Sequence, residues 1–217
     1  MDSTPHIGEG LYTIPDAAHI LRLPQGKLRR WLNDYWKIDK GLIWADEKNE
    51  KFFNFHTLIE IYTINAFRKE GFSAIKIKKH REELKKRLGI KHPFASTEFL
   101  LDSRHINAKL PDSSLIQLGT NGQLVFEEII EPFCKKIDFH NNLAKRYWPE
   151  GKEVSSVVVD PRHCFGKPSI INTNISTETL YYCHMGGEAV DDIADMYEIL
   201  PNQIEDAINF EKASKAA

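Results

Sequence analysis

The chain has 217 residues, of which 41% are hydrophobic and 28% are charged. This composition is typical of a folded globular protein and excludes collagen, a disordered tail and a low-complexity linker. The formal net charge of −2 conceals two parts of opposite sign, separated by residues 93–150 with 6 Lys and Arg against 8 Asp and Glu. Residues 1–92 hold 18 Lys and Arg against 12 Asp and Glu, whereas residues 151–217 hold 5 against 11. The basic part favours a phosphate-bearing partner and the acidic part a basic protein surface, and the alternative is two solvated surfaces of opposite bias.

The sequence predicts a cytoplasmic protein without a membrane partner. No apolar run approaches the ~20 residues that a membrane-spanning helix needs. The first ten residues, MDSTPHIGEG, lack the basic and apolar regions of a secretory signal. The three cysteines are Cys134, Cys164 and Cys183, and none belongs to a CxxC pair. An odd number without such a pair argues against a disulfide framework.

The first predicted elements are two short helices joined by a tight turn. Thr13 is expected to cap a helix with Pro15 in its first turn, and Leu23-Pro24 ends that helix. The second helix is expected from about Gln25 to Leu32. Its apolar stripe consists of Leu28, Trp31 and Leu32. This arrangement is a helix-turn-helix, whose second helix enters the major groove of DNA. The polar side chains opposite the stripe are Gln25, Lys27, Arg29 and Arg30.

A β-hairpin and two longer helices follow. Apolar residues flank the polar turn DEKNEK within residues 41–55, which predicts a wing with Lys48 and Lys51 near the DNA backbone. Residues 55–71 are expected to form a helix that ends at Gly71. Ser73 caps a further, partly exposed helix to about Leu88, before Gly89. Its predicted apolar stripe consists of Ile75, Ile77, Leu84 and Leu88.

Residues 12–88 resemble the DNA-binding domain of the MerR family. The shared features are the opening YTIPDAAHILRLPQGKLRRW, an aromatic wing and the helix–Gly–helix run FRKEGFSAIKIKKHREEL. The family's Leu-Arg-aromatic element corresponds to Leu28-Arg29-Arg30-Trp31. The resemblance implies a winged helix-turn-helix in which Arg29 contacts DNA. Pro24-Gln25-Gly26 replaces the family's frequent Ser-Pro-Arg, so a base preference does not carry over.

Residues 93–150 are expected to form a connecting region. Asn121-Gly122 is a strong hairpin turn signal within residues 114–130. A helix is expected from about Val125 to Ile137, and YWPEG at 147–151 marks a boundary. The predicted fold is therefore mainly α with small β-hairpins. It comprises a winged helix-turn-helix over residues 1–92, the connecting region over 93–150, and a C-terminal helical domain over 151–217.

The C-terminal part is predicted to contain two short strands and three helices. The strands are residues 157–159 and residues 170–171, and the helices are 177–185, 190–197 and 201–212. The last two helices have a helix-turn-helix shape. Their acidic surface repels phosphate, so packing, dimerisation or capture of a basic partner is the favoured role.

This part resembles the antitoxin-associated domain of unknown function 433. The matching features are V-D-P-R, F-G-K-P-S-I-I, G-G-E-A-V-D-D-I-A-D-M-Y and L-P-N-Q-I-E-D-A-I-N-F. Such families resemble VapB-type antitoxins and are often encoded beside a PIN-like toxin. Residues 172–175, Asn-Thr-Asn-Ile, replace the family's usual Gly-Thr-Arg-Ile, so the charge of that step is missing.

No catalytic, metal or cofactor site is predicted. His163-Cys164 and Cys183-His184 could together supply zinc ligands, but adjacent side chains on one element point in different directions. Asp160, Asp191, Asp192 and Asp195 are expected on an acidic helix surface and not in a nuclease site. The chain has no Gly-rich phosphate loop, nucleophile elbow or HExxH motif. The aromatic residues of the N-terminal part are expected to form its core, with single-strand stacking as the alternative.

Three functions fit these patterns. The first is a homodimeric type II antitoxin that neutralises a PIN-like ribonuclease toxin and represses its own operon. Its candidate contacts with operator DNA are Thr13, Gln25, Lys27, Arg29, Arg30, Lys48 and Lys51. The second is a stand-alone MerR-like transcriptional regulator whose C-terminal domain binds a ligand or a protein. The third is an interaction scaffold without a DNA role.

Overall fold

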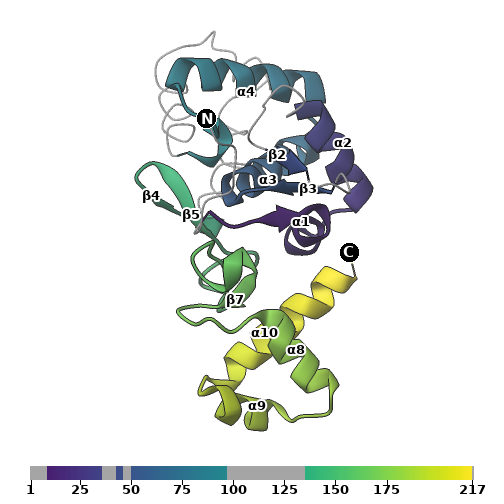
Figure 1. The fold of residues 1–217 in the computed structure, drawn as a ribbon, viewed down its shortest axis with the longest axis vertical. Coiled ribbons are helices and arrows are strands. Elements are labelled where there is room, and N and C mark those ends of the chain that lie inside the picture. Colours follow the sequence, from purple (N-terminus) through teal and green to yellow (C-terminus); the bar gives the residue numbers. More distant parts are fainter. Residues whose placement is uncertain (1–8, 36–42, 46–49, 97–134, 217) are drawn as a thin grey trace. The chain divides into compact units, whose positions relative to one another are not determined.

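The computed structural model describes residues 9–35, 43–45, 50–96 and 135–216, which are mainly helical (Figure 1). Its contacts divide the chain into two compact units. The first unit combines Met1–Phe55 with Arg146–Ala217, and the second is His56–Lys145. The first unit thus contains both chain ends, which carry opposite charge. Among the described residues, no helix has the length and hydrophobicity needed to cross a bilayer.

The N-terminal part of the first unit begins with β1 (Tyr12–Thr13), α1 (Ile14–Leu21) and α2 (Gln25–Tyr35). Thr13 is the N-cap of α1, and Pro15 lies in the first turn. Residues 22–24 join the two helices. These observations confirm the predicted cap and the predicted break before Pro24. Helix α2 buries Leu28, Trp31 and Leu32, the predicted apolar stripe, and extends to Tyr35.

The predicted hairpin strands are present as β2 (Ile43–Ala45) and β3 (Lys51–Phe53). They lie in an antiparallel sheet of order β1-β3-β2, in which Tyr12 pairs with Phe53 and Trp44 with Phe52. The sheet therefore joins the segment before α1 to the hairpin. The predicted turn DEKNEK spans residues 46–51, of which 46–49, including Lys48, lie outside the described part of the chain, while Lys51 already belongs to β3.

The C-terminal part of the first unit starts in β5 (Leu143–Tyr147), which crosses the boundary between the units. Strands β6 (Val157–Val159) and β7 (Pro168–Ile170) follow, and the three helices are α8 (Thr177–Met185), α9 (Val190–Tyr197) and α10 (Pro201–Lys215). Strand β6 lies between β5 and β7 and is antiparallel to both. The predicted second strand begins two residues earlier than expected. Figure 1 shows α10 beside α8, with α9 at their end.

One apolar core holds the strands and helices of this part together. Its buried members come from every predicted helix and from both strands: Val157, Ile170, Leu180, Ile193, Ala194, Ile204, Ala207, Ile208 and Phe210. Ser176 caps α8 by accepting a hydrogen bond from the backbone N–H of Thr179. Pro201 lies in the first turn of α10. The three C-terminal helices agree with the predicted ranges, and the buried apolar core, the Ser176 cap and Pro201 hold them in place.

Asp160, which directly follows β6, is a buried carboxylate that accepts hydrogen bonds from two arginines. Its oxygens accept hydrogen bonds from Arg146 Nε at 2.8 Å, Arg162 Nε at 2.9 Å, Arg162 Nη2 at 2.5 Å and the Arg162 backbone N–H at 3.0 Å. Burial alone would raise the pKa of Asp160, but these hydrogen bonds outweigh it and hold the pKa well below its usual range. The V-D-P-R motif is therefore a structural turn built on an ionised aspartate.

The second unit contains most of α3 (Phe55–Lys69), α4 (Ala74–Leu88), the short 3₁₀ helix η1 (Pro93–Ala95) and β4 (Ile137–His140). Ser73 caps α4 and Gly89 ends it in a left-handed conformation, as predicted. Strand β4 was not predicted. It meets β5 at Asn141 and Asn142, which both have positive φ, the backbone conformation of a tight hairpin turn.

Helix α4 buries Ile77 and Leu84 of its predicted apolar stripe, but its buried face differs from the expected one at two positions. Ile75, a predicted member of its apolar stripe, is 81% exposed, whereas Arg81 is completely buried. Arg81 donates to Glu60 of α3, with Nε–Oε1 at 3.1 Å and Nη2–Oε2 at 2.8 Å. Burial raises the pKa of Glu60, but the Arg81 guanidinium and His92 lower this pKa by more than burial raises it. The Glu60 carboxylate therefore stays ionised beside Arg81.

Two further predictions concern the connecting region. The hairpin at 114–130 lies outside the described residues, as does the expected helix over residues 125–134. Lys135 and Lys136 are helical, but Ile137 is the first residue of β4 and not the end of a helix. Ile137 is buried, so pairing and burial in a strand determine its conformation.

The buried pair predicts a large cost for removing one partner. Arg81→Met would leave the Glu60 carboxylate buried without its cation and lower the free energy of unfolding by about 3–5 kcal/mol. The double variant Glu60→Leu with Arg81→Met should recover much of this loss. Urea denaturation of the full chain measures both. The control is Lys79→Met, since Lys79 is exposed and pairs with the exposed Glu83 at 3.8 Å. Equal losses in Arg81→Met and Lys79→Met would contradict the assignment.

Asp160 predicts a pH-dependent stability. Asp160→Asn weakens charge-assisted hydrogen bonds and should lower the free energy of unfolding by about 1–3 kcal/mol at neutral pH. Because the pKa of Asp160 is lowered in the folded state, its contribution is complete above its unfolded pKa and is lost as pH falls through the folded value. The gap between variant and wild type should therefore narrow below about pH 4. Asp195→Asn, at an exposed carboxylate of α9, is the control. A gap that stays constant down to pH 2 would contradict this account.

Candidate nucleic-acid interface

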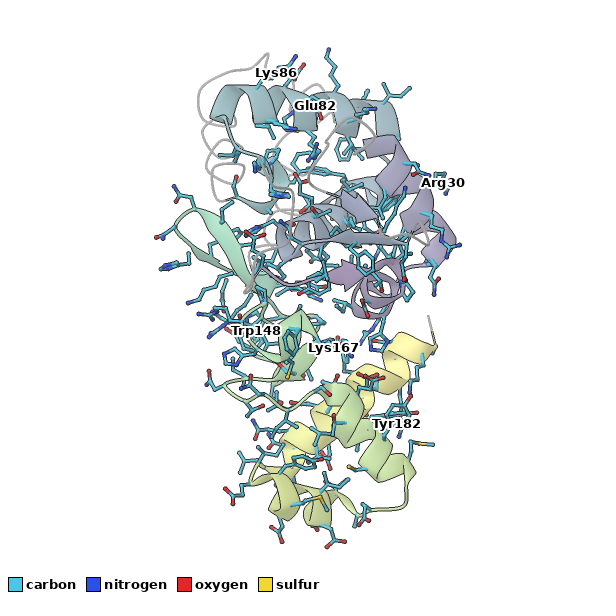
Figure 2. The ribbon with its side chains drawn as sticks, in the orientation of Figure 1. Arg30, Glu82, Lys86, Trp148, Lys167 and Tyr182 are labelled. Carbon is cyan, nitrogen blue, oxygen red and sulfur yellow. The ribbon has the colours of Figure 1, made fainter. Side chains whose placement is uncertain are left out.

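Helix α2 presents an exposed cationic face. Gln25, Arg29 and Arg30 are exposed, while the opposite stripe is buried. Figure 2 shows Arg30 pointing away from the ribbon. The side chains of Arg29 and Arg30 make no hydrogen bond or ion pair with another residue in the part of the chain that the structure describes. Their guanidinium groups are therefore available for bidentate contacts with phosphate or with guanine.

Lys27 lies differently from these two arginines. It is half-buried, and its Nζ stands 4.6 Å from the centroid of the Trp31 ring, one turn along α2. This spacing is a cation–π contact, which holds the aliphatic stem of Lys27 over the indole. Lys27 therefore shields Trp31 and belongs to the edge of the cationic face.

The hairpin is linked to α2 through Lys51. Lys51, the first residue of β3, donates from Nζ to Oδ1 of Asn33 on α2. The contact brings one of the two predicted wing lysines to α2. The other, Lys48, lies outside the described residues, so its position relative to α2 stays a prediction.

Thr13 uses its hydroxyl in the cap of α1. Its Oγ1 accepts from the backbone N–H of Asp16 at 3.2 Å and donates to Asp16 Oδ2 at 2.6 Å. The backbone N–H of Thr13 donates to the same carboxylate oxygen at 2.8 Å. This reciprocal capping box fixes the start of α1. Thr13 is thus placed to stabilise the helix pair from its N-terminal end.

Arg22, in the turn between α1 and α2, was not among the predicted site residues. Its side chain binds the Glu150 carboxylate and lies over the ring of Phe210 with 5.5 Å to the centroid. Its Nε is 3.5 Å from Ser214 Oγ on α10. His19 of α1 makes a similar contact, with Nε2 at 3.1 Å from Glu211 Oε2. No local pattern could reveal these contacts, because the partners lie 128 or more residues away along the chain.

A cavity of about 310 Å³ lies beside this junction within the first unit. Its lining includes His19 and Pro15 of α1, Glu211 and Lys215 of α10, and the exposed side chain of Phe165. The cavity has both apolar walls and charged groups, the usual composition of a small-molecule site.

The C-terminal helices present the opposite charge. Residues 168–211 contain no Lys or Arg. The exposed face of α9 carries Asp191, Asp192 and Asp195, as expected for an acidic helix surface. The same expectation was wrong for Asp160, which is buried after β6 and not on a helix. Among the described residues, no group of three or more His, Cys, Asp or Glu is arranged to hold a metal ion, and Cys164 and Cys183 are free thiols.

Comparison with known proteins identifies both ends of the chain. Residues 12–84 match the family model described as MerR HTH family regulatory protein. Residues 157–210 match the model described as protein of unknown function, DUF433. Both matches coincide with the segments in which the sequence motifs were found.

Two curated relatives come from Mycobacterium tuberculosis. The protein named "Putative antitoxin VapB45" is 25% identical over 92% of this chain and 92% of its own length. The protein named "Uncharacterized protein Rv2308" is 20% identical over all of this chain and 96% of its own length. Both likenesses therefore extend across the MerR-type and DUF433 segments together.

A crystal structure shows the same fold. The structure of Rv2018 from Mycobacterium tuberculosis superposes with a TM-score of 0.68 at 23% identity, covering 91% of this chain and 96% of the other. The fold is therefore shared over nearly the whole chain. The two resemblances found in the sequence are confirmed: the chain carries a MerR-type helix-turn-helix segment at its N-terminus and a DUF433 segment at its C-terminus.

Proposed function

We propose that the protein is the antitoxin of a type II toxin–antitoxin system. It represses its own operon by binding operator DNA and neutralises a PIN-like ribonuclease toxin by direct binding. The observation that carries the DNA-binding half is the exposed pair Arg29 and Arg30 on the second helix of a MerR-type helix-turn-helix segment. The toxin-binding half is supported by the likeness to a protein named putative antitoxin VapB45.

Helix α2 is the recognition helix of this proposal. Gln25 and Arg29 lie one turn apart on its exposed side, so both can reach base edges when the helix enters the major groove. Arg30 and the edge residue Lys27 reach phosphate, and Lys51 with Lys48 contacts the backbone from the wing. Thr13 supports the same interface from the cap of α1. The operator is expected to be a palindrome bound by a homodimer, because symmetric half-sites suit a two-fold protein.

The DUF433 segment provides the toxin-binding part, together with or instead of the connecting region. Its exposed carboxylates repel phosphate and attract a basic protein surface. Exposed apolar side chains, Met196 and Leu200 among them, lie close to these carboxylates in the sequence and supply area for burial against a partner. The protein acts in this proposal by occupying the toxin's active site and has no catalytic role.

One observation favours a second candidate function. The cavity of about 310 Å³ between α1 and the C-terminal segment could bind a small ligand. In that case the protein is a stand-alone MerR-like regulator whose C-terminal part receives the ligand. The two candidates differ in the neighbouring gene, because only an antitoxin requires a toxin gene beside its own.

Arg29→Ala tests the recognition helix. The variant loses a charge-assisted contact and should bind the DNA upstream of its own gene with roughly tenfold to hundredfold weaker affinity in a gel shift. The control is Lys212→Ala, which removes an exposed cation from α10. Both variants should keep the wild-type melting temperature. Wild-type affinity in Arg29→Ala would show that α2 has been wrongly assigned as the recognition helix.

Co-expression with the neighbouring gene product tests the second half. The wild-type chain should copurify with that protein and restore growth of cells that express it. Arg29→Ala should do so equally well, since its toxin-binding surface is unchanged. A chain that binds its operator but neither copurifies with the neighbour nor rescues growth would support the stand-alone regulator instead.

A further inference from the structure

We propose that Arg22 is a positioning residue for DNA recognition, through which the C-terminal segment holds the turn of the helix-turn-helix in its DNA-reading geometry. This inference rests on the proposed DNA binding by α2. It adds that the DUF433 segment helps to position α2 for DNA binding, although the surface of that segment is acidic. Arg22 acts through α2 and makes no DNA contact itself.

The backbone at Arg22 decides where α2 begins. Arg22 is the C-cap of α1, with φ 51° and ψ 54°, a left-handed conformation that favours glycine. An arginine in this conformation must be held by its surroundings. Three side chains surround it, the Glu150 carboxylate, Ser214 Oγ at 3.5 Å from Nε, and the Phe210 ring. All three come from residues 146–217.

His19 supplies a second contact between α1 and α10. Its ring stands edge-on to Phe210 with centroids 5.5 Å apart, and its Nε2 is 3.1 Å from Glu211 Oε2. Glu211 is only 2% exposed and also accepts the Thr177 hydroxyl at 2.5 Å. Both its oxygens thus have a partner, so sliding α1 along α10 would strand a buried carboxylate.

The N-terminal end of α1 is held by the same segment. A Cβ on Gly166 would lie 2.2 Å from the Tyr12 hydroxyl oxygen, and Gly166 itself has φ +86°. Only glycine fits there while the Tyr12 ring keeps its place. Tyr12 precedes α1 by two residues, so the C-terminal segment holds α1 at both ends and leaves its orientation fixed.

Geometry shows why this matters for recognition. Helix α2 has 11 residues, so it is about 16 Å long at the usual rise per residue. A tilt of roughly 10° at the turn would move its far end by about 3 Å. Specific hydrogen bonds to base edges tolerate only a few tenths of an ångström. Loosening Arg22 would therefore reduce operator affinity without unfolding either helix.

Glu150→Gln tests the proposal by weakening the contact with Arg22 through a residue that is far from α2 in the sequence. Removing a carboxylate should strengthen binding to DNA if only charge matters. The proposal expects the opposite, a roughly threefold to tenfold loss of operator affinity, the size typical of an energetic coupling between sites. Glu153→Gln is the matched control, because Glu153 is exposed and its side chain makes no hydrogen bond or ion pair with the described residues. Its affinity should equal or slightly exceed that of the wild type.

A double-variant cycle completes the experiment. Arg22→Gly keeps the left-handed turn and removes the side chain, and it should lose as much operator affinity as Arg22→Gly combined with Glu150→Gln. The salt dependence of binding should match the wild type in all variants, because no phosphate contact is removed. Melting temperatures are recorded for each full-length variant.

The outcomes separate this inference from the proposed function. Wild-type or tighter operator binding by Glu150→Gln overturns the positioning role, as does additivity of the two substitutions. A shallower salt dependence of operator binding in Arg22→Gly would show that Arg22 contacts phosphate directly. This result would also overturn the positioning role. If the wild type shows no operator binding, both the proposed function and this inference fail. If operator affinity falls in Arg29→Ala but not in Glu150→Gln, this inference fails and the proposed DNA binding stands.

Discussion

The junction between α1 and α10 is the contact on which the first unit depends. A buried glutamate, Glu211, faces His19 from the other end of the chain, and the pKa of its carboxyl is kept below its usual range despite burial. Burial opposes ionisation, but the hydrogen bonds from His19 and Thr177 outweigh it. A buried charge needs these partners, so the two ends of the chain cannot separate without losing them. Residues 12–55 of the MerR-type segment and the DUF433 segment therefore share one compact unit.

The same principle appears twice more in the molecule. Asp160 holds the strand-to-turn segment after β6 through two arginines, and Glu60 holds α3 to α4 through Arg81. In each case an acid that burial would neutralise stays ionised because guanidinium donors surround it. Apolar cores supply the bulk of the stability, whereas these pairs define which residues must face one another.

The exposed charges at the two ends of the chain have opposite sign. Arg29 and Arg30 leave a cationic helix face open for phosphate and bases, and α9 leaves an acidic face open for a basic partner. The junction places both faces on one unit, which is the arrangement that the proposed positioning role of Arg22 requires. A two-function protein that binds DNA and a second macromolecule fits this arrangement, and the likeness to a protein named putative antitoxin VapB45 supports it.

The sequence by itself determined the local elements and the two family resemblances. The caps at Thr13 and Ser73 and the stop at Gly89 act within a few residues, so a short stretch of sequence is enough to predict them. The exposure of Arg29 and Arg30 also follows from helical periodicity. Only the tertiary structure decided which charged residues are buried. Arg81 and Arg22 look like surface cations in sequence, yet each meets a partner at least 21 residues away. Long-range packing sets those contacts, and no local pattern encodes them.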